Sequence, residues 1–193
     1  MKARTGLFSF ALIATATLTS VAEAHTGSAG PAGFAHPFTG IDHLLAMITV
    51  GAFAYLAGGR ALWLVPATFV ATMAAGAAIG IAGVEVSLVE TAIALSLIAA
   101  GALVAFGRKV PVVFAMALVG IFAAFHGYAH GTEMPAGASA LSYGAGFAAA
   151  TALLLASGAI GAAAVSRLAD RAALRFGGAA VAAAGLAILG GIA

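Results

Sequence analysis

The sequence has 193 residues, of which 63% are hydrophobic and only 7% are charged, and its mean hydropathy is +1.14. A soluble domain carries roughly a quarter charged residues, so this composition excludes one and indicates a surface that mostly faces lipid. The net charge of +2 comes from eight Lys and Arg whose placement favours a membrane topology over nucleic-acid binding. The sequence contains no cysteine, which excludes disulfides and thiolate metal sites.

The first 24 residues have the pattern of a secretory signal peptide. Basic residues precede an apolar run at 7–18, and a small-x-small cleavage site ends at Ala24. An uncleaved first transmembrane helix is the alternative interpretation of residues 1–24. Cleavage would make His25 the new N-terminus, where the α-amine and the imidazole could together chelate a metal, although the same residue could belong to a solvated tail.

The remaining residues, 25–193, are predicted to form a single transmembrane domain. A helix that crosses a bilayer needs about 20 apolar residues, and on that basis we expect an all-α, polytopic membrane helix bundle with about six spans. The spans are expected at approximately 40–58, 61–83, 86–106, 110–131, 138–163 and 174–192. Their short connections predict that sequential helices are antiparallel neighbours. No Walker-type phosphate loop occurs, so the chain is not expected to hydrolyse ATP.

The basic residues predict the orientation of the spans. All six Lys and Arg after the signal lie in alternate connections, at Arg60, Arg108, Lys109, Arg167, Arg171 and Arg175. The positive-inside rule makes these connections cytoplasmic, which predicts a protein of the bacterial inner (cytoplasmic) membrane. Both ends of the mature chain are then periplasmic, and the signal peptide independently predicts that side for the N-terminus.

The histidines and most acidic side chains fall at the opposite, outer ends of the predicted spans. These residues are His36, Asp42, His43, Glu85, Glu90, His126, His130 and Glu133. Among the acidic residues after the signal, Asp170 alone lies on the cytoplasmic side. Ionisable residues are costly within a membrane and usually mark pathways or relays, so this segregation is the main indication of function.

The first cluster of such residues is the segment 36–43. A proline and a glycine in it predict a turn before a helix that begins near Ile41. A folded-back segment would bring His36 close to Asp42 and His43. Asp42 could bind a metal directly, fix a histidine tautomer by accepting the second ring N–H, or stabilise the first helical turn.

The second cluster is the segment 126–133. His126 and His130 are about 40° apart around a helix, so both imidazoles can reach one ion. Glu133 returns to the same face if the helix continues. The two glycines between these residues form a small-x-x-x-small pair, which close helix packing alone would explain.

A sulfur-free set of imidazoles and carboxylates favours Ni²⁺, Co²⁺ or Zn²⁺ over Cu(I). The predicted metal ligands are His25, His36, Asp42, His43, Glu90, His126, His130 and Glu133. No permanently bound cofactor is expected, because such a cluster at the outer mouth of the spans is expected to hold a metal as substrate. Glu90 could relay the ion inward or lie solvated at the interface. Histidine must be neutral to ligate, so binding is expected to weaken as the pH falls toward about 6.5.

These two segments resemble the signatures of the HupE/UreJ family of small membrane proteins. The matching residues are His36-Pro37, Gly40 and Asp42-His43, followed by Phe125-His126-Gly127, Ala129-His130-Gly131 and Glu133. The resemblance extends over the whole chain, from the signal through the six helices. It implies secondary uptake of nickel, with cobalt as a substrate of some members, and supply of the metal to hydrogenase or urease maturation proteins.

We therefore expect a permease for a divalent transition metal, with no enzyme activity, and the resemblance implies nickel. One alternative is a haem- or metal-binding membrane redox protein in which His43 and His130 are opposite axial ligands. Another is a non-transporting accessory subunit whose histidines only pack or cap.

Overall fold

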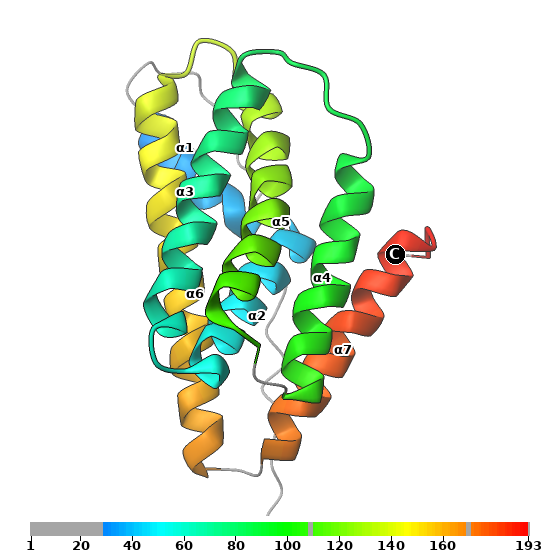
Figure 1. The fold of residues 1–193 in the computed structure, drawn as a ribbon. Helices are drawn as coiled ribbons and strands as arrows, with labels where there is room; N and C mark the ends of the chain where they lie inside the picture. Colours follow the sequence, from blue (N-terminus) through cyan, green and yellow to red (C-terminus); the bar gives the residue numbers. More distant parts are fainter. Residues whose placement is uncertain (1–28, 108–109, 169–170, 193) are drawn as a thin grey trace, which may run out of the picture.

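The computed structural model describes residues 29–107, 110–168 and 171–192, and no strand occurs within these ranges. Its elements are α1 (Ala29–Ala35), the 3-10 turn η1 (His36–Phe38), α2 (Ile41–Ala57), α3 (Ala61–Ile81), α4 (Val89–Phe106), α5 (Val112–Thr132), α6 (Ala140–Leu168) and α7 (Arg171–Leu189), as Figure 1 shows. The predicted all-α class is confirmed. The predictions of a signal peptide at 1–24 and of a metal ligand at His25 lie outside the described residues.

The sequence predicts about six spans, and the structure has five or six candidates. Five helices, α3 to α7, are long and apolar enough to cross a membrane, and the count is six if α1–η1 and α2, which meet at a bend of 80°, are taken together as one broken span. Large apolar side chains such as Trp63, which is 75% exposed, cover the outside of the bundle, where lipid would contact them. The main boundary difference is that α6 continues to Leu168 and α7 begins at Arg171, so the last connection is shorter than expected.

Successive helices from α2 to α7 run in alternating directions (Figure 1). The starts of α2, α4 and α6 and the ends of α3 and α5 therefore share one end of the bundle, which we call the histidine end. The described arginines Arg60, Arg167 and Arg175 lie at the opposite end. There, Arg175 Nε donates a 2.8 Å hydrogen bond to the carbonyl oxygen of Ala105, near the end of α4.

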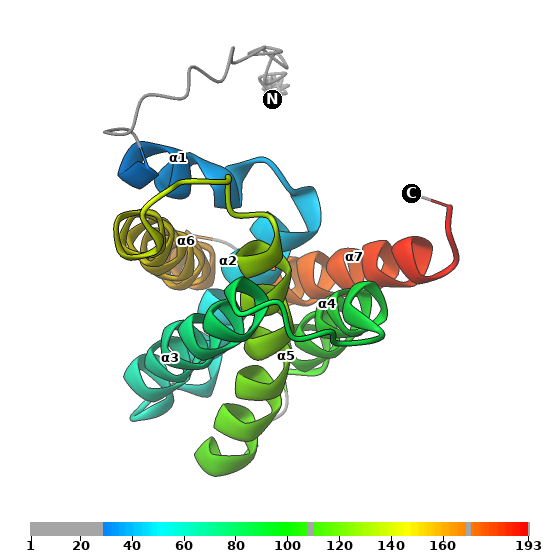
Figure 2. The same cartoon turned by 90° about the horizontal axis from the view of Figure 1, so that it is seen from above.

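The prediction that sequential helices are neighbours is wrong for two connections. Within the described ranges, the backbones of α3 and α4 do not run close together, and neither do those of α5 and α6, although side chains such as His130 and Phe147 meet between the latter two. The most extensive contacts instead join α3 with α5, α4 with α7, and α2 with α6, as the view along the bundle shows (Figure 2). A short connection keeps two helix ends close together, but the side chains along the helices decide which faces pack.

Glycines explain this choice of partners. A Cβ atom added at Gly76 of α3 or at Gly127 of α5 would overlap the backbone of the other helix. The same overlap would occur at Gly51 of α2 and Gly158 of α6. Small residues allow membrane helices to approach closely and gain packing contacts. The two pairs of parallel helices, α3 with α5 and α2 with α6, therefore meet along glycine-lined crossings.

The chain enters the bundle at the histidine end through a bent segment. Thr39 Oγ1 donates a 2.7 Å hydrogen bond to the carbonyl oxygen of His36, closing the η1 turn. Gly40 is extended, with φ −99° and ψ 120°, and α2 begins at Ile41 as the sequence predicted. Helix α1 was not predicted. It lies across α6 (Figure 2), where buried Gly33 brings the two backbones together.

Candidate metal centre

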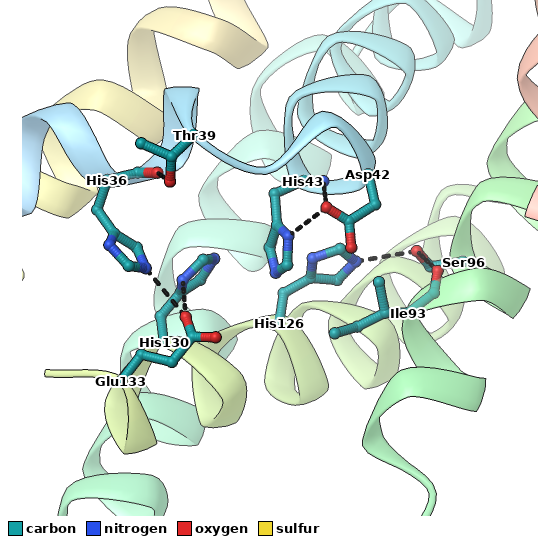
Figure 3. Close-up of polar contacts among 9 residues, drawn as sticks. All are labelled: His36, Thr39, Asp42, His43, Ile93, Ser96, His126, His130 and Glu133. Carbon is teal, nitrogen blue, oxygen red and sulfur yellow. Dashed lines mark hydrogen bonds and ion pairs between the residues drawn. The ribbon is translucent and has the colours of Figure 1, made fainter. Parts of the chain in front are cut away.

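Four histidine side chains from η1, α2 and α5 meet at the histidine end (Figure 3). The ring centroids of His36 and His130 are 4.8 Å apart, those of His43 and His130 are 4.2 Å apart, and those of His43 and His126 are 4.8 Å apart. The two segments singled out in the sequence therefore form one cluster. Because the entry segment is bent, a residue that precedes α2 reaches the end of α5.

His36, His130 and Glu133 form the more exposed part of this cluster, which we call the carboxylate site. Glu133 Oε2 lies 3.0 Å from His36 Nε2 and 3.4 Å from His130 Nδ1. One ligand atom from each residue lies within 4.8 Å of the other two, a spacing that side-chain rotation can close onto one ion at about 2.1 Å. His36 was expected to approach Asp42 and His43, but its hydrogen bond is with Glu133.

Asp42 orients the ring of His43 at the start of α2. Its Oδ1 accepts hydrogen bonds from His43 Nδ1 and from the His43 backbone N–H, both at 2.8 Å. Carboxylates commonly hold metal-binding histidines in this way, with the other ring nitrogen left for the metal. His43 Nε2 is buried and has no hydrogen-bond partner within the described residues. Of the three roles that the sequence left open for Asp42, this geometry fits the orienting role best.

His126 is fully buried between the helices and lies beside a serine of α4. Its Nε2 is 2.9 Å from Ser96 Oγ, and its Nδ1 has no hydrogen-bond partner in the part of the chain that the structure describes. Ser96 was not predicted from the sequence as part of the site. A serine in a helix usually bonds to a carbonyl one turn earlier, so only its position inside an apolar span could have indicated a further role.

Aromatic and apolar side chains surround the histidines. The Phe147 ring lies 4.3 Å from that of His130, measured between centroids. Next to His126, a cavity of about 20 Å³ is lined by apolar side chains that include Phe53 and Phe69, with Ser96 as its other polar group. This volume is close to the space that one water molecule needs. The apolar side chains that line the cavity therefore enclose the site on the side away from the histidine end.

Glu90 lies apart from the cluster. It is an exposed residue in the first turn of α4, closer to the helix end than the sequence suggested. Among the described residues, it makes no hydrogen bond or ion pair with a histidine. The position of Glu90 matches the solvated alternative that the sequence left open and does not itself support an inward relay.

The haem alternative requires two histidines on opposite sides of a porphyrin. The proposed pair, His43 and His130, has ring centroids only 4.2 Å apart. With iron–nitrogen bonds of about 2 Å on each side, like those of other imidazole ligands, rings this close leave no space for a macrocycle between them. The structure therefore disfavours this pair as axial ligands.

Comparison with known proteins identifies the family of this bundle. Residues 13–188 match the family model described as HupE / UreJ protein. The chain is 46% identical over 183 residues to a protein named Protein HupE from Rhizobium leguminosarum bv. viciae, and the alignment covers 93% of this chain and 95% of that protein. No solved structure matches the chain. Together, the family match and the near full-length similarity show that the chain belongs to the HupE/UreJ family.

Proposed function

We propose that this chain is a secondary permease that takes up a divalent transition metal, principally Ni²⁺, for the maturation of hydrogenase or urease. The observation that carries the proposal is the cluster of four histidines and one glutamate at one end of an apolar helix bundle. Membership of the HupE/UreJ family supports it, because the cluster is built from residues of both segments that resemble the family signatures.

The chemistry of the cluster limits the substrate to a class of ions. Imidazole nitrogen suits Ni²⁺, Co²⁺ and Zn²⁺, whereas Mg²⁺ and Ca²⁺ prefer sites made of oxygen. The carboxylate site is the accessible part, since the side chain of Glu133 is 55% exposed. A hydrated ion would exchange its first water molecules there and then contact the buried rings of His43 and His126. Co²⁺ and Zn²⁺ are therefore the expected competitors.

We place the histidine end on the periplasmic side of the inner membrane. The supporting observation is the position of the described arginines Arg60, Arg167 and Arg175, which lie at the other end of the bundle. Positive residues favour the cytoplasmic side. The metal would then bind from the periplasm and leave toward the cytoplasm.

The test is uptake of radiolabelled Ni²⁺ into proteoliposomes that contain the purified full-length protein. We expect the Glu133→Gln variant and the His126→Ala/His130→Ala double variant to lose most uptake. The matched control is Glu85→Gln, because Glu85 is also exposed and lies in the connection before α4 at the same end. Excess Co²⁺ should compete with Ni²⁺, whereas excess Mg²⁺ should not. Unchanged uptake in both site variants would contradict the proposal.

A non-transporting accessory subunit is the second candidate, and the cavity beside His126 is the observation that favours it. The buried rings of Phe53 and Phe69 line this cavity, so an ion could cross only if these side chains moved. Binding of Ni²⁺ to the purified protein without uptake into proteoliposomes would identify the protein as such a subunit.

A further inference from the structure

We propose that Ser96 is a positioning residue, which fixes the tautomer of His126 and so directs its free ring nitrogen into a second, buried metal site formed with His43 and His130. We call this second site the imidazole site. The inference rests on the proposed function only in taking the ligand to be a divalent transition metal.

The hydroxyl group of Ser96 has a single proton to donate. Ser96 Oγ lies 2.6 Å from the carbonyl oxygen of Ile93, which can only accept a hydrogen bond. The hydroxyl proton must therefore point to Ile93, because two oxygens this close would otherwise face each other with lone pairs. Ser96 Oγ is then an acceptor toward His126 Nε2, 2.9 Å away. His126 consequently carries its ring proton on Nε2.

The other ring nitrogen of His126, Nδ1, is left free to bind a metal. A neutral imidazole that is protonated on Nε2 has its lone pair on Nδ1. His126 is 0% exposed, and Nδ1 has no hydrogen-bond partner in the described residues. A buried polar atom without a partner is unfavourable, so a ligand for Nδ1 would stabilise the site. In Figure 3, Ser96 lies on one side of the His126 ring, and His43 lies on the other side.

The ring of His43 is oriented in the same way. Asp42 Oδ1 accepts the proton of His43 Nδ1 at 2.8 Å, so the lone pair of His43 is on Nε2. This nitrogen is also buried without a hydrogen-bond partner among the described residues. His43 is thus protonated on Nδ1 and His126 on Nε2. In each ring a neighbouring acceptor holds the proton, and the other nitrogen is available to a metal.

His130 completes the imidazole site and joins it to the carboxylate site. Within the described residues neither of its ring nitrogens makes a hydrogen bond, although Nδ1 lies 3.4 Å from Glu133. Its ring centroid is 4.2 Å from that of His43. An ion leaving the half-exposed carboxylate site could therefore keep His130 as a ligand while it gained the other two imidazoles. A site of three neutral nitrogens favours Ni²⁺, Co²⁺ and Zn²⁺ over ions that need oxygen ligands.

The structural alternative is that Ser96 only satisfies its hydroxyl group within α4. Ser157 of α6 does this, since its Oγ donates a 2.7 Å hydrogen bond to the carbonyl oxygen of Leu154. Both serines thus donate a hydrogen bond to a carbonyl oxygen of the preceding turn. Of the two, Ser96 also lies beside a histidine ring, and Ser157 makes no such contact among the described residues. Ser157→Ala is therefore the matched control for Ser96→Ala.

The direct test is NMR of the metal-free, full-length protein with ¹⁵N-labelled histidine, in which a His126→Ala variant assigns the His126 signals. We expect wild-type His126 to be protonated on Nε2. We expect Ser96→Ala to shift it toward protonation on Nδ1, Ser96→Thr to restore the wild-type tautomer, and Ser157→Ala to leave it unchanged. Wild-type His126 with its proton on Nδ1 would overturn the inference, and this measurement needs no Ser96 variant to fold, only the His126→Ala variant that assigns the signals.

The consequence for metal is measured by calorimetry with Ni²⁺ and by X-ray absorption of the bound ion. Loss of a group that orients a metal-binding histidine typically weakens affinity by 10–100-fold, so we expect a weakening of this size and fewer imidazole ligands in Ser96→Ala. Unchanged affinity and ligand number in a folded Ser96→Ala protein would also overturn the inference. If the wild type binds Ni²⁺ with the predicted tautomer but does not transport it, the permease proposal fails and this inference stands.

Discussion

The crossing of α3 and α5 holds the histidines of α5 in place, and replacement of Gly127 by alanine should disturb it. Gly127 follows His126 in the sequence and faces the backbone of Met73 on α3. An alanine Cβ at this position would lie within 3.0 Å of the oxygen, carbon and Cα atoms of Met73, whereas ordinary contacts begin at 3.4 Å. The obstacle is backbone, so a change of rotamer cannot relieve the overlap. The two helices must separate.

The size of the effect follows from the geometry of metal binding. A displacement of about 1 Å can cost a factor of about 10² where groups must meet in a defined geometry, and metal–ligand distances are held to within about 0.2 Å. We therefore expect Gly127→Ala to weaken Ni²⁺ binding by about 10²-fold and to reduce uptake in parallel. Calorimetry on the purified protein and uptake into proteoliposomes measure the two quantities, and circular dichroism checks that the variant remains helical.

Gly120→Ala is the matched control on the same helix. A Cβ at Gly120 would lie 3.3 Å from Cγ2 of Thr68 and 3.4 Å from Cγ2 of Thr72, which are side-chain methyl groups that can move slightly. We expect binding and uptake close to those of the wild type. A helical Gly127→Ala protein with wild-type affinity would refute the reasoning, and so would equal losses in the two variants.

Two further predictions concern the ligands themselves. We expect Asp42→Ala to lose 10–100-fold in Ni²⁺ affinity. Asp42→Asn should lose less, because the amide oxygen of asparagine can still accept the proton of His43 Nδ1. Equal losses of the two variants in calorimetry would show instead that the carboxylate binds the metal directly. Protons compete with metals for imidazole nitrogen, so the dissociation constant for Ni²⁺ should rise when the solution is acidified far enough to protonate the ligands. A dissociation constant that stays unchanged on acidification down to the pH at which the protein unfolds would contradict ligation by histidine.

The features of the fold that depend on composition could be predicted from the sequence. Long apolar runs predicted the helices, because a bilayer requires every backbone polar group to be satisfied within the span. The four-residue spacing of His126 and His130 placed both rings on one face of α5. The proline and glycine of the segment 36–43 predicted the turn that precedes α2. Each of these inferences needs only local sequence.

The choice of helix neighbours could not be predicted in the same way. Gly76 and Gly127 are recognisable as small residues in apolar spans, but many other glycines and alanines in this chain are similar candidates for a crossing. Which two stripes meet depends on the packing of all the helices together. Helix α1, Ala29–Ala35, is also too short to be recognised as a span, and it gains its packing contacts from α6, more than 100 residues later.

The candidate site shows the same limit at the level of single atoms. Residue types predicted which histidines gather at one end, but a histidine has two nitrogens, and the sequence does not say which one is free. That choice depends on the acceptor beside each ring: for His43 it is the adjacent residue Asp42, whereas for His126 it is Ser96, which lies 30 residues earlier on another helix. An adjacent partner can be identified from the sequence, and the roles that the sequence left open for Asp42 included the orienting one. A partner on another helix becomes visible only after the helices are packed, and for this reason the geometry of the imidazole site depends on contacts between α2, α4 and α5.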